Sequence, residues 1–291
     1  MITIPPKHPY SIVVSLYGQE FKVKDWASEF RSFAVRLSNR VDIPFRYFYC
    51  TFFDNNEILT KELRMIPRNS EKIDQFVRST NLRSLGFSAI AADAPNRHRD
   101  YDIEVFLARP HPSPYVRKPW HQFFLMLAPP AYQALAKSGE ADLYFLELFR
   151  EVESFIDVRY GLVNATPSEK LPALYFSNII TNTLSTSDRN DLSIWRRCGH
   201  LYQMKIRGVY WGNLITDLHL GENRQVILNE LGNILGTANV QEWSEGKYFF
   251  LMPTDLAELP KNPNQFEQIH GKLHHILAKY ELFMEQASCE E

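Results

Sequence analysis

The sequence predicts an α+β fold made of two related halves, each a mainly antiparallel sheet with helices packed on one face. Hydrophobic residues make up 45 % of the 291 residues and aromatic residues 13 %, enough for a large buried core. Strand-like and helix-like stretches alternate without the regular strand–helix period of a parallel sheet. The halves are expected at residues 1–153 and 154–291, or as one compact unit, and no sequence repeat accompanies them.

The first half is predicted to start with a strand at 11–18, which is rich in β-branched residues. A helix follows, with Asp25 as its N-cap and Trp26, Phe30 and Leu37 on one apolar stripe. Apolar and aromatic runs then alternate with polar and Pro-rich loops. In chain order they predict a strand at 44–53, a short helix from 70 and a hairpin of strands at 85–94 and 101–110. A strand from 121 and an amphipathic helix at 139–154 complete this half.

The second half is predicted to start with an alternating strand at 154–166. Residues 200–215 are expected to be extended, because Gly208 and Gly212 favour a strand that admits a close neighbouring backbone. Trp211 would then pack between the sheet and a helix. The remaining elements are expected to be a helix at 223–236, capped by Asn223 and stopped by Gly236, a strand at 246–253 and a helix at 264–285.

Charge and cysteine content limit the kind of function. Lys plus Arg (32) nearly balance Asp plus Glu (34), so no overall field attracts nucleic acid or an anionic membrane. The three cysteines are far apart, which argues against a disulfide framework or a CxxC zinc site and favours a reducing compartment. Without a signal peptide or a long apolar stretch, the protein is expected to be cytoplasmic. The chain has no GxSxG, P-loop, HExxH or GxGxxG motif, so no catalytic residue, cofactor or metal ligand is assigned.

Two groups of side chains could still bind a divalent metal. His270 and His274 lie four residues apart on a predicted helix and share a face, although no third ligand is visible. Asp100, Asp102 and Glu104 alternate along a predicted strand and project from one face, as the carboxylates of metal-dependent nucleases do. The lysine that such nucleases carry shortly afterwards is absent, so a solvated sheet face or edge is the plainer interpretation.

An acidic ridge is predicted on the helix at 139–154. Glu140, Glu147 and Glu151 fall at spacings of seven and four along one stripe, opposite an apolar face. Such a ridge either keeps the helix soluble or forms a surface that meets a basic partner.

The second half carries a series of motifs that resembles a known family. "FIDVRYGLVNA" contains Tyr160 and Gly161, "IRGVYWGNLI" contains Gly208 and Trp211, and "LGNILG" ends a helix. From about residue 155 to 291 this order resembles the bacterial immunity-protein family associated with type VI secretion (TsiV-type, formerly a domain of unknown function). In the first half only the strand–helix–strand plan matches, and the double-glycine turn after the tryptophan segment is reduced to "LGEN".

The resemblance implies a non-enzymatic antitoxin that binds a toxic effector protein in the cytoplasm and blocks its active site. A nuclease is the expected kind of toxin, and the acidic ridge or the acidic strand would then plug its basic cleft. No cofactor, nucleic acid or membrane is implied. Two alternatives stay open, namely a metal-dependent enzyme of unrecognised type and a scaffold or adaptor that binds a neighbour without neutralising it.

Overall fold

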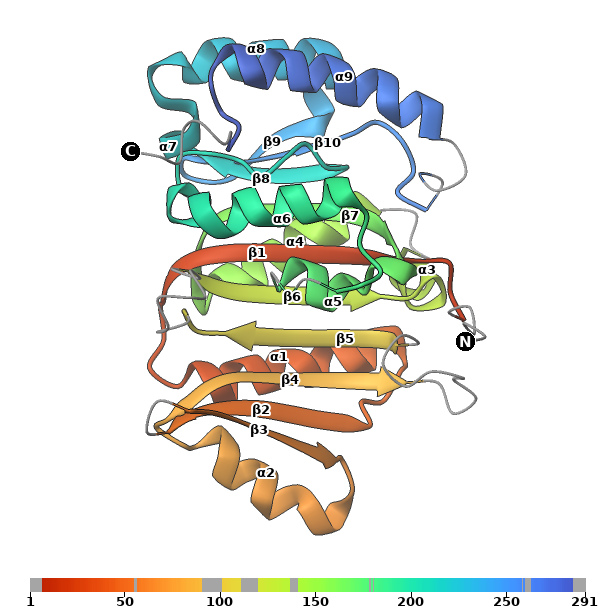
Figure 1. Cartoon of the computed structure of the whole chain (residues 1–291), viewed down its shortest axis with the longest axis vertical. Coiled ribbons are helices and arrows are strands. Elements are labelled where there is room, and N and C mark those ends of the chain that lie inside the picture. The colour runs from red at the N-terminus through yellow and green to blue at the C-terminus, as the bar shows by residue number, and fades with distance from the viewer. Residues whose placement is uncertain are drawn as a thin grey trace.

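The computed structural model shows one ten-stranded sheet with helices on both of its faces (Figure 1). Its strands run in the order β3-β2-β4-β5-β6-β1-β7-β8-β10-β9, and every neighbouring pair is antiparallel. The α+β class and the mainly antiparallel sheet are therefore confirmed. The structure describes residues 7–54, 57–90, 101–110, 120–136, 141–177, 179, 181–257, 259 and 263–284.

The first half forms the predicted elements close to their expected places, and it adds β3 and α3, which the sequence patterns did not predict. Helix α1 (Trp26–Val41) begins after Asp25, whose carboxylate accepts a hydrogen bond from the Ser28 backbone N–H, and this confirms the predicted cap. Phe33 of this helix packs edge-on against Phe123 of the sheet. The other elements of this half are β1 (Tyr10–Phe21), β2 (Tyr47–Asp54), β3 (Glu57–Arg64), α2 (Ser70–Val77), β4 (Leu82–Ile90), β5 (Tyr101–Ala108), β6 (His121–Leu127), α3 (Pro129–Ala136) and α4 (Ala141–Glu153).

The second half continues the same sheet. Strand β7 pairs with β1 on one side and with β8 on the other. The elements of the second half are β7 (Ile156–Pro167), α5 (Pro172–Phe176), α6 (Thr186–Cys198), β8 (Gly212–Thr216), α7 (Asp217–Leu220), α8 (Arg224–Leu235), β9 (Val240–Ser244), β10 (Lys247–Leu251) and α9 (Pro263–Lys279).

The extended stretch predicted at 200–215 forms a strand only from Gly212 onwards. Before it, Ile206 pairs with the end of the described chain instead of the sheet: its N–H donates to the Leu282 carbonyl, and its own carbonyl accepts from the Met284 N–H. The buried side chain of Asn213 then bonds both backbone groups of Tyr210 and fixes the turn into β8. The prediction of one continuous strand is therefore wrong, because a side chain takes the backbone hydrogen bonds that a ladder would need.

Helices cover the two faces of the sheet in different places. Helices α1, α3 and α4 contact one another behind the strands in Figure 1, whereas α5 and α6 lie in front of β6, β1 and β7. Phe149 of α4 packs edge-on against Phe249 of β10, so this helix also covers strands of the second half. Buried side chains from both halves join one hydrophobic cluster.

Candidate functional site

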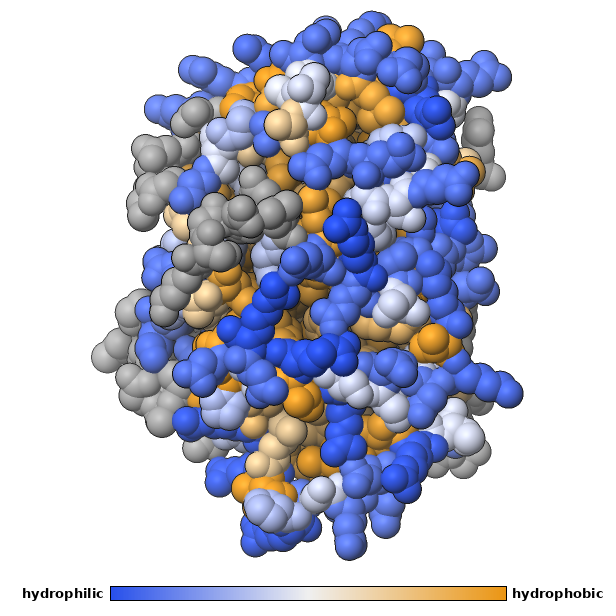
Figure 2. Space-filling view, turned by 180° about the vertical axis from the view of Figure 1, so that it is seen from behind, coloured by the Kyte–Doolittle hydropathy of each residue, from blue (hydrophilic) through white to orange (hydrophobic). Residues whose placement is uncertain are grey.

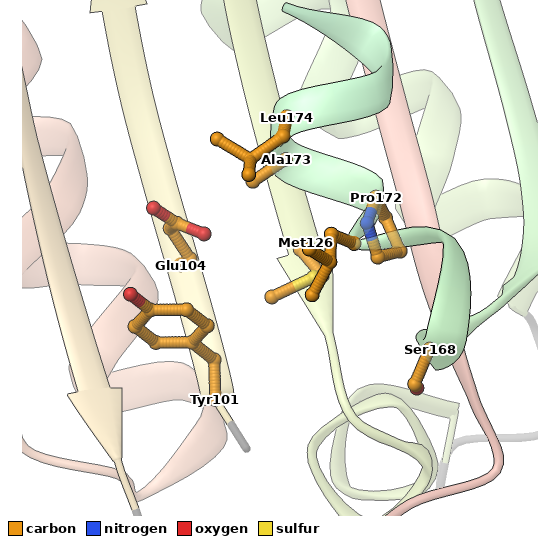
Figure 3. Close-up of a pocket in the computed structure, with 8 residues that line it drawn as sticks. Tyr101, Glu104, Met126, Ser168, Pro172, Ala173 and Leu174 are labelled. Carbon is orange, nitrogen blue, oxygen red and sulfur yellow. The ribbon is translucent and has the colours of Figure 1, made fainter. Parts of the chain in front are cut away.

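A cavity of about 210 Å³ lies between strands β5 and β6 and helix α5 (Figure 3). The short helix α5 starts at Pro172, after Leu171 turns the chain with a left-handed backbone (φ 51°). In Figure 3, Tyr101 and Glu104 of β5 face the α5 side chains across the cavity. Most of the cavity wall is apolar. Its main lining residues are Tyr101, Glu104, Met126, Ser168, Ala173 and Leu174.

Glu104 is the charged group of this cavity. Only 7 % of the residue is exposed. Its Oε1 atom accepts a hydrogen bond from the Tyr49 hydroxyl at 2.9 Å, and its buried Oε2 atom has no hydrogen-bond partner among the described residues. Burial raises the pKa of Glu104 to about 7, against the opposing effect of the Tyr49 hydrogen bond. At neutral pH the group is therefore divided between a carboxylic acid and a carboxylate.

A glycine brings Tyr49 and Glu104 together across an intervening strand. Tyr49 lies on β2 and Glu104 on β5, and Gly86 of β4 is the cross-strand partner of Tyr49. A Cβ atom at position 86 would lie 2.2 Å from the Tyr49 ring, so only glycine leaves room for the ring to lie across β4. Burial first, and the Glu104 carboxylate second, raise the pKa of Tyr49 well above its usual value. The hydroxyl is therefore protonated at neutral pH and acts as a donor.

The interpretation of the acidic strand as a solvated face or edge is wrong for Glu104. Strand β5 lies inside the sheet, between β4 and β6, and α5 stands over its neighbour β6. Asp102 lies two residues earlier, beside a register shift in the β4–β5 pairing that breaks the alternation of faces. It keeps 25 % of its side chain exposed and lies 3.5 Å from His8 Nε2. Asp100 lies outside the described residues. The strand thus supplies one buried and one partly exposed carboxyl group.

The acidic ridge of α4 is paired with arginines from another helix. Glu147 accepts a hydrogen bond from Arg40 at 2.6 Å, and Glu151 accepts one from Arg36 at 2.7 Å. Both arginines belong to α1, and the face where α1 and α4 lie is largely hydrophilic (Figure 2). Glu140 lies outside the described residues. The arginines offset much of the negative charge of Glu147 and Glu151. The acidic ridge therefore attracts a basic partner less than the sequence alone suggests.

Two of the four motif residues stack and hydrogen-bond inside the core. The Tyr160 ring stacks on Tyr17 with ring centroids 5.6 Å apart, and its hydroxyl accepts a hydrogen bond from the Arg207 backbone N–H. Trp211 is buried, donates from Nε1 to the Thr254 carbonyl at 2.6 Å, and meets a phenylalanine ring of α4 edge-on. Trp211 therefore packs between the sheet region and a helix, as predicted.

The two motif glycines differ in how tightly they are enclosed. A Cβ atom at Gly161 would lie 2.5 Å from the tip of the Leu16 side chain of β1, so a larger residue would force this buried side chain to move. A Cβ atom at Gly208 would meet Tyr210 at 3.5 Å, which is an ordinary contact. The close contact with the Leu16 side chain thus explains Gly161, whereas no contact of this kind explains Gly208.

A buried arginine holds α5 and α6 against the sheet. The Arg207 guanidinium donates to the Asp191 carboxylate of α6 at 2.7 Å. It also lies over the rings of Tyr175 on α5 and Trp195 on α6, at 4.6 Å and 5.5 Å from their centroids. Arg207 belongs to the "IRGVYWGNLI" motif, but sequence reasoning gave it no role. It fixes the helix that forms one wall of the cavity.

The two candidate histidines lie side by side on α9. The rings of His270 and His274 have centroids 6.2 Å apart, and His274 stacks on Phe283. Burial, with a smaller contribution from His274, lowers the pKa of His270. Within the described part of the chain, no group of three or more His, Cys, Asp or Glu side chains is arranged to hold a metal ion.

The described cysteines differ in state. Cys50 is free and buried, and burial raises the pKa of its thiol to about 12. Cys198 is disulfide-bonded, which the wide spacing of the three cysteines did not predict. No helix in the described residues is long and apolar enough to cross a membrane.

Comparison with known proteins shows a likeness of fold to a solved structure. No family model matches the chain, and no curated protein sequence matches it. Among solved structures, the T6SS protein PA0821 of Pseudomonas aeruginosa is similar, with a TM-score of 0.52 over 95 % of this chain and 74 % of that chain. The sequences are 11 % identical, so the comparison shows a shared fold. Membership of the TsiV-type family is not supported by a family model.

Proposed function

We propose that this protein is a type VI secretion immunity protein, which binds a cognate toxin and neutralises it by covering its active site. The observation that carries the proposal is the likeness of fold, over nearly the whole chain, to a protein described as belonging to the type VI secretion system. The order of motifs around Tyr160 and Trp211 points to the same system. A protein that inhibits by covering an active site needs a preorganised surface and no catalytic residues.

The surface that we assign to the toxin is the one around α5. Leu174 and Ile179 are among the large apolar side chains that stay exposed, at 37 % and 48 %. Leu174 lines the cavity that contains the buried Glu104. Apolar anchors around a desolvated polar group are typical of the centre of a protein interface. By contrast, the acids of the α4 ridge already have arginine partners.

We propose a nuclease as the toxin, because nuclease clefts use basic residues to attract phosphate and an acidic group can meet such residues. A nuclease acts on nucleic acid, so we place the protein in the cytoplasm with its target. The disulfide of Cys198 counts against this location, because a reducing compartment opens disulfides. Alkylation of freshly lysed cells, followed by mass measurement, should find Cys198 as a free thiol if the cytoplasmic location is correct. If Cys198 reacts with the alkylating agent only after a reductant is added, the protein comes from an oxidising compartment.

Co-expression tests the proposed function. The proposal places the gene of the toxic effector next to the gene for this chain. That neighbouring gene is induced in a host cell with and without the full-length protein, and survival is counted. The proposal predicts death with the effector alone and survival with both proteins. Binding of the effector without survival would instead support a scaffold or adaptor, and no binding would refute the proposal. A metal-dependent enzyme would show stoichiometric metal in the purified protein, lost in His270→Ala or Asp102→Ala.

A further inference from the structure

Two features of the cavity beside α5 favour the same kind of ligand. One wall is apolar and includes Met126, Ala173 and Leu174. Opposite it, the buried Oε2 atom of Glu104 has no hydrogen-bond partner among the described residues. A buried carboxyl oxygen without a partner is costly, so a ligand that supplies a donor there gains more than a surface contact would give.

We infer that this cavity receives the side chain of a lysine carried by the toxin, with the aliphatic stem along α5 and the ammonium group at Glu104. The inference rests on the proposed function and names the chemistry by which the partner is recognised. A lysine has an apolar four-carbon stem with a cation at its tip, which matches an apolar wall that leads to one acid. Binding would hold Glu104 as a carboxylate, because a nearby cation favours the charged form.

The hydrogen bonds already present favour lysine over arginine. Oε1 of Glu104 accepts from the Tyr49 hydroxyl, which leaves Oε2 as the free oxygen. An arginine binds a carboxylate best through two parallel hydrogen bonds to both oxygens, whereas an ammonium group acts as a point charge and needs only one. The hydroxyl of Tyr101 also lines the cavity, lies beside the Glu104 carboxyl group in Figure 3 and can accept another ammonium proton.

The chemistry of the cavity can be tested without the toxin. The full-length protein, labelled at its methionine methyl groups, is titrated with n-butylammonium chloride and, separately, with n-butanol, a neutral molecule of the same size. We expect a saturable shift of the Met126 methyl signal with butylammonium, in the millimolar range that so small a ligand allows, and none with butanol. The shift should disappear in Glu104→Gln. No saturable shift in the wild-type protein, an equal shift with butanol or an unchanged shift in Glu104→Gln would each overturn the inference.

A second experiment tests whether the toxin supplies this lysine. It measures how tightly the effector encoded by the neighbouring gene binds the wild-type protein and three variants. Glu104→Gln removes the charge, and Ala173→Leu fills the cavity while Glu104 stays in place. Each should weaken binding by at least about tenfold. Asp102→Asn is the matched control: it removes a charge from the same strand, does not line the cavity and should bind like the wild type.

The outcomes separate the two proposals. Equal affinity of the wild type, Glu104→Gln and Ala173→Leu would overturn the lysine assignment while the proposed function stands. An equal loss in Asp102→Asn would also overturn it, because the effect would then be general acidity. An effector that does not bind the wild type refutes the proposed function, and the butylammonium titration still decides the chemistry of the cavity.

Discussion

Replacing Glu104 with glutamine should stabilise the protein at pH 8 and leave its stability nearly unchanged at pH 4. Glutamine has almost the same shape as a protonated glutamic acid and can still accept the Tyr49 hydrogen bond. At pH 4 the buried glutamic acid is protonated and costs little. At pH 8 the wild-type protein must either bury a carboxylate or keep Glu104 protonated at a pH where a free carboxyl group is ionised. Both cost free energy.

The expected size follows from the pKa of Glu104. Its value rises from an ordinary 4.5 to about 7 on folding. Between these two values the unfolded chain has lost the proton while the folded chain keeps it, so the free energy of unfolding decreases as the pH rises. Above about pH 7 both states are ionised and the penalty stays constant. A shift of this size corresponds to roughly 3 kcal/mol in total, as an order of magnitude.

Urea unfolding of the wild type and Glu104→Gln at a series of pH values between 4 and 8 measures this contribution. The difference between the two free energies of unfolding cancels most other titrating groups, and it should grow steadily from pH 4 to pH 7 in favour of the variant. Asp102→Asn, at a partly exposed carboxyl on the same strand, should show a much smaller change. A difference that stays constant with pH would refute the burial of Glu104 and the reasoning built on it.

Three further variants test other parts of the structure. Gly161→Ala should lower the free energy of unfolding by about 1–3 kcal/mol in a urea titration, because its Cβ would overlap the buried Leu16 side chain. Unchanged stability would contradict this close contact. Arg207→Met should cost about 2–4 kcal/mol in the same assay, since it leaves a carboxylate without its buried partner, and a loss below about 0.5 kcal/mol would contradict the role given to this arginine. Glu147→Lys with Glu151→Lys should change stability by less than about 1 kcal/mol, because both ion pairs are solvent-accessible, and should leave effector affinity unaltered; slower effector association at low salt would return the acidic ridge to the interface.

Local sequence patterns predicted the elements whose signals are short-range. The Asp25 cap and the apolar stripe of α1 both lie within one helix, and the hairpin of β4 and β5 follows from two apolar runs around a polar loop. Helix α6 could also have been predicted. Ser185 and Asp188 form a capping box ahead of the buried Leu192 and Trp195, which are three residues apart. Strand β3 gives a weaker signal, because it is a charged, largely exposed edge strand.

The candidate site depends on contacts that are distant in the sequence. Glu104 meets Tyr49 from 55 residues away, and α5 reaches the cavity from the other half of the chain. The alternation of acids on this strand is local, but whether such a face is solvated depends on strand order, which the sequence pattern does not contain. The ridge acids likewise find arginine partners 107 and 115 residues away. Sequence reasoning could therefore select the acidic residues but could not decide which of them is buried and which is paired.

Titration of the effector's nuclease activity with the purified full-length protein tests the proposed mode of action most directly. If the protein neutralises its toxin by covering the active site, activity should fall linearly and reach zero at one molecule of protein per molecule of effector. Glu104→Gln should require a clearly higher concentration for the same inhibition. Full nuclease activity in a saturated complex, or no complex at all, would contradict an immunity protein that acts by occlusion.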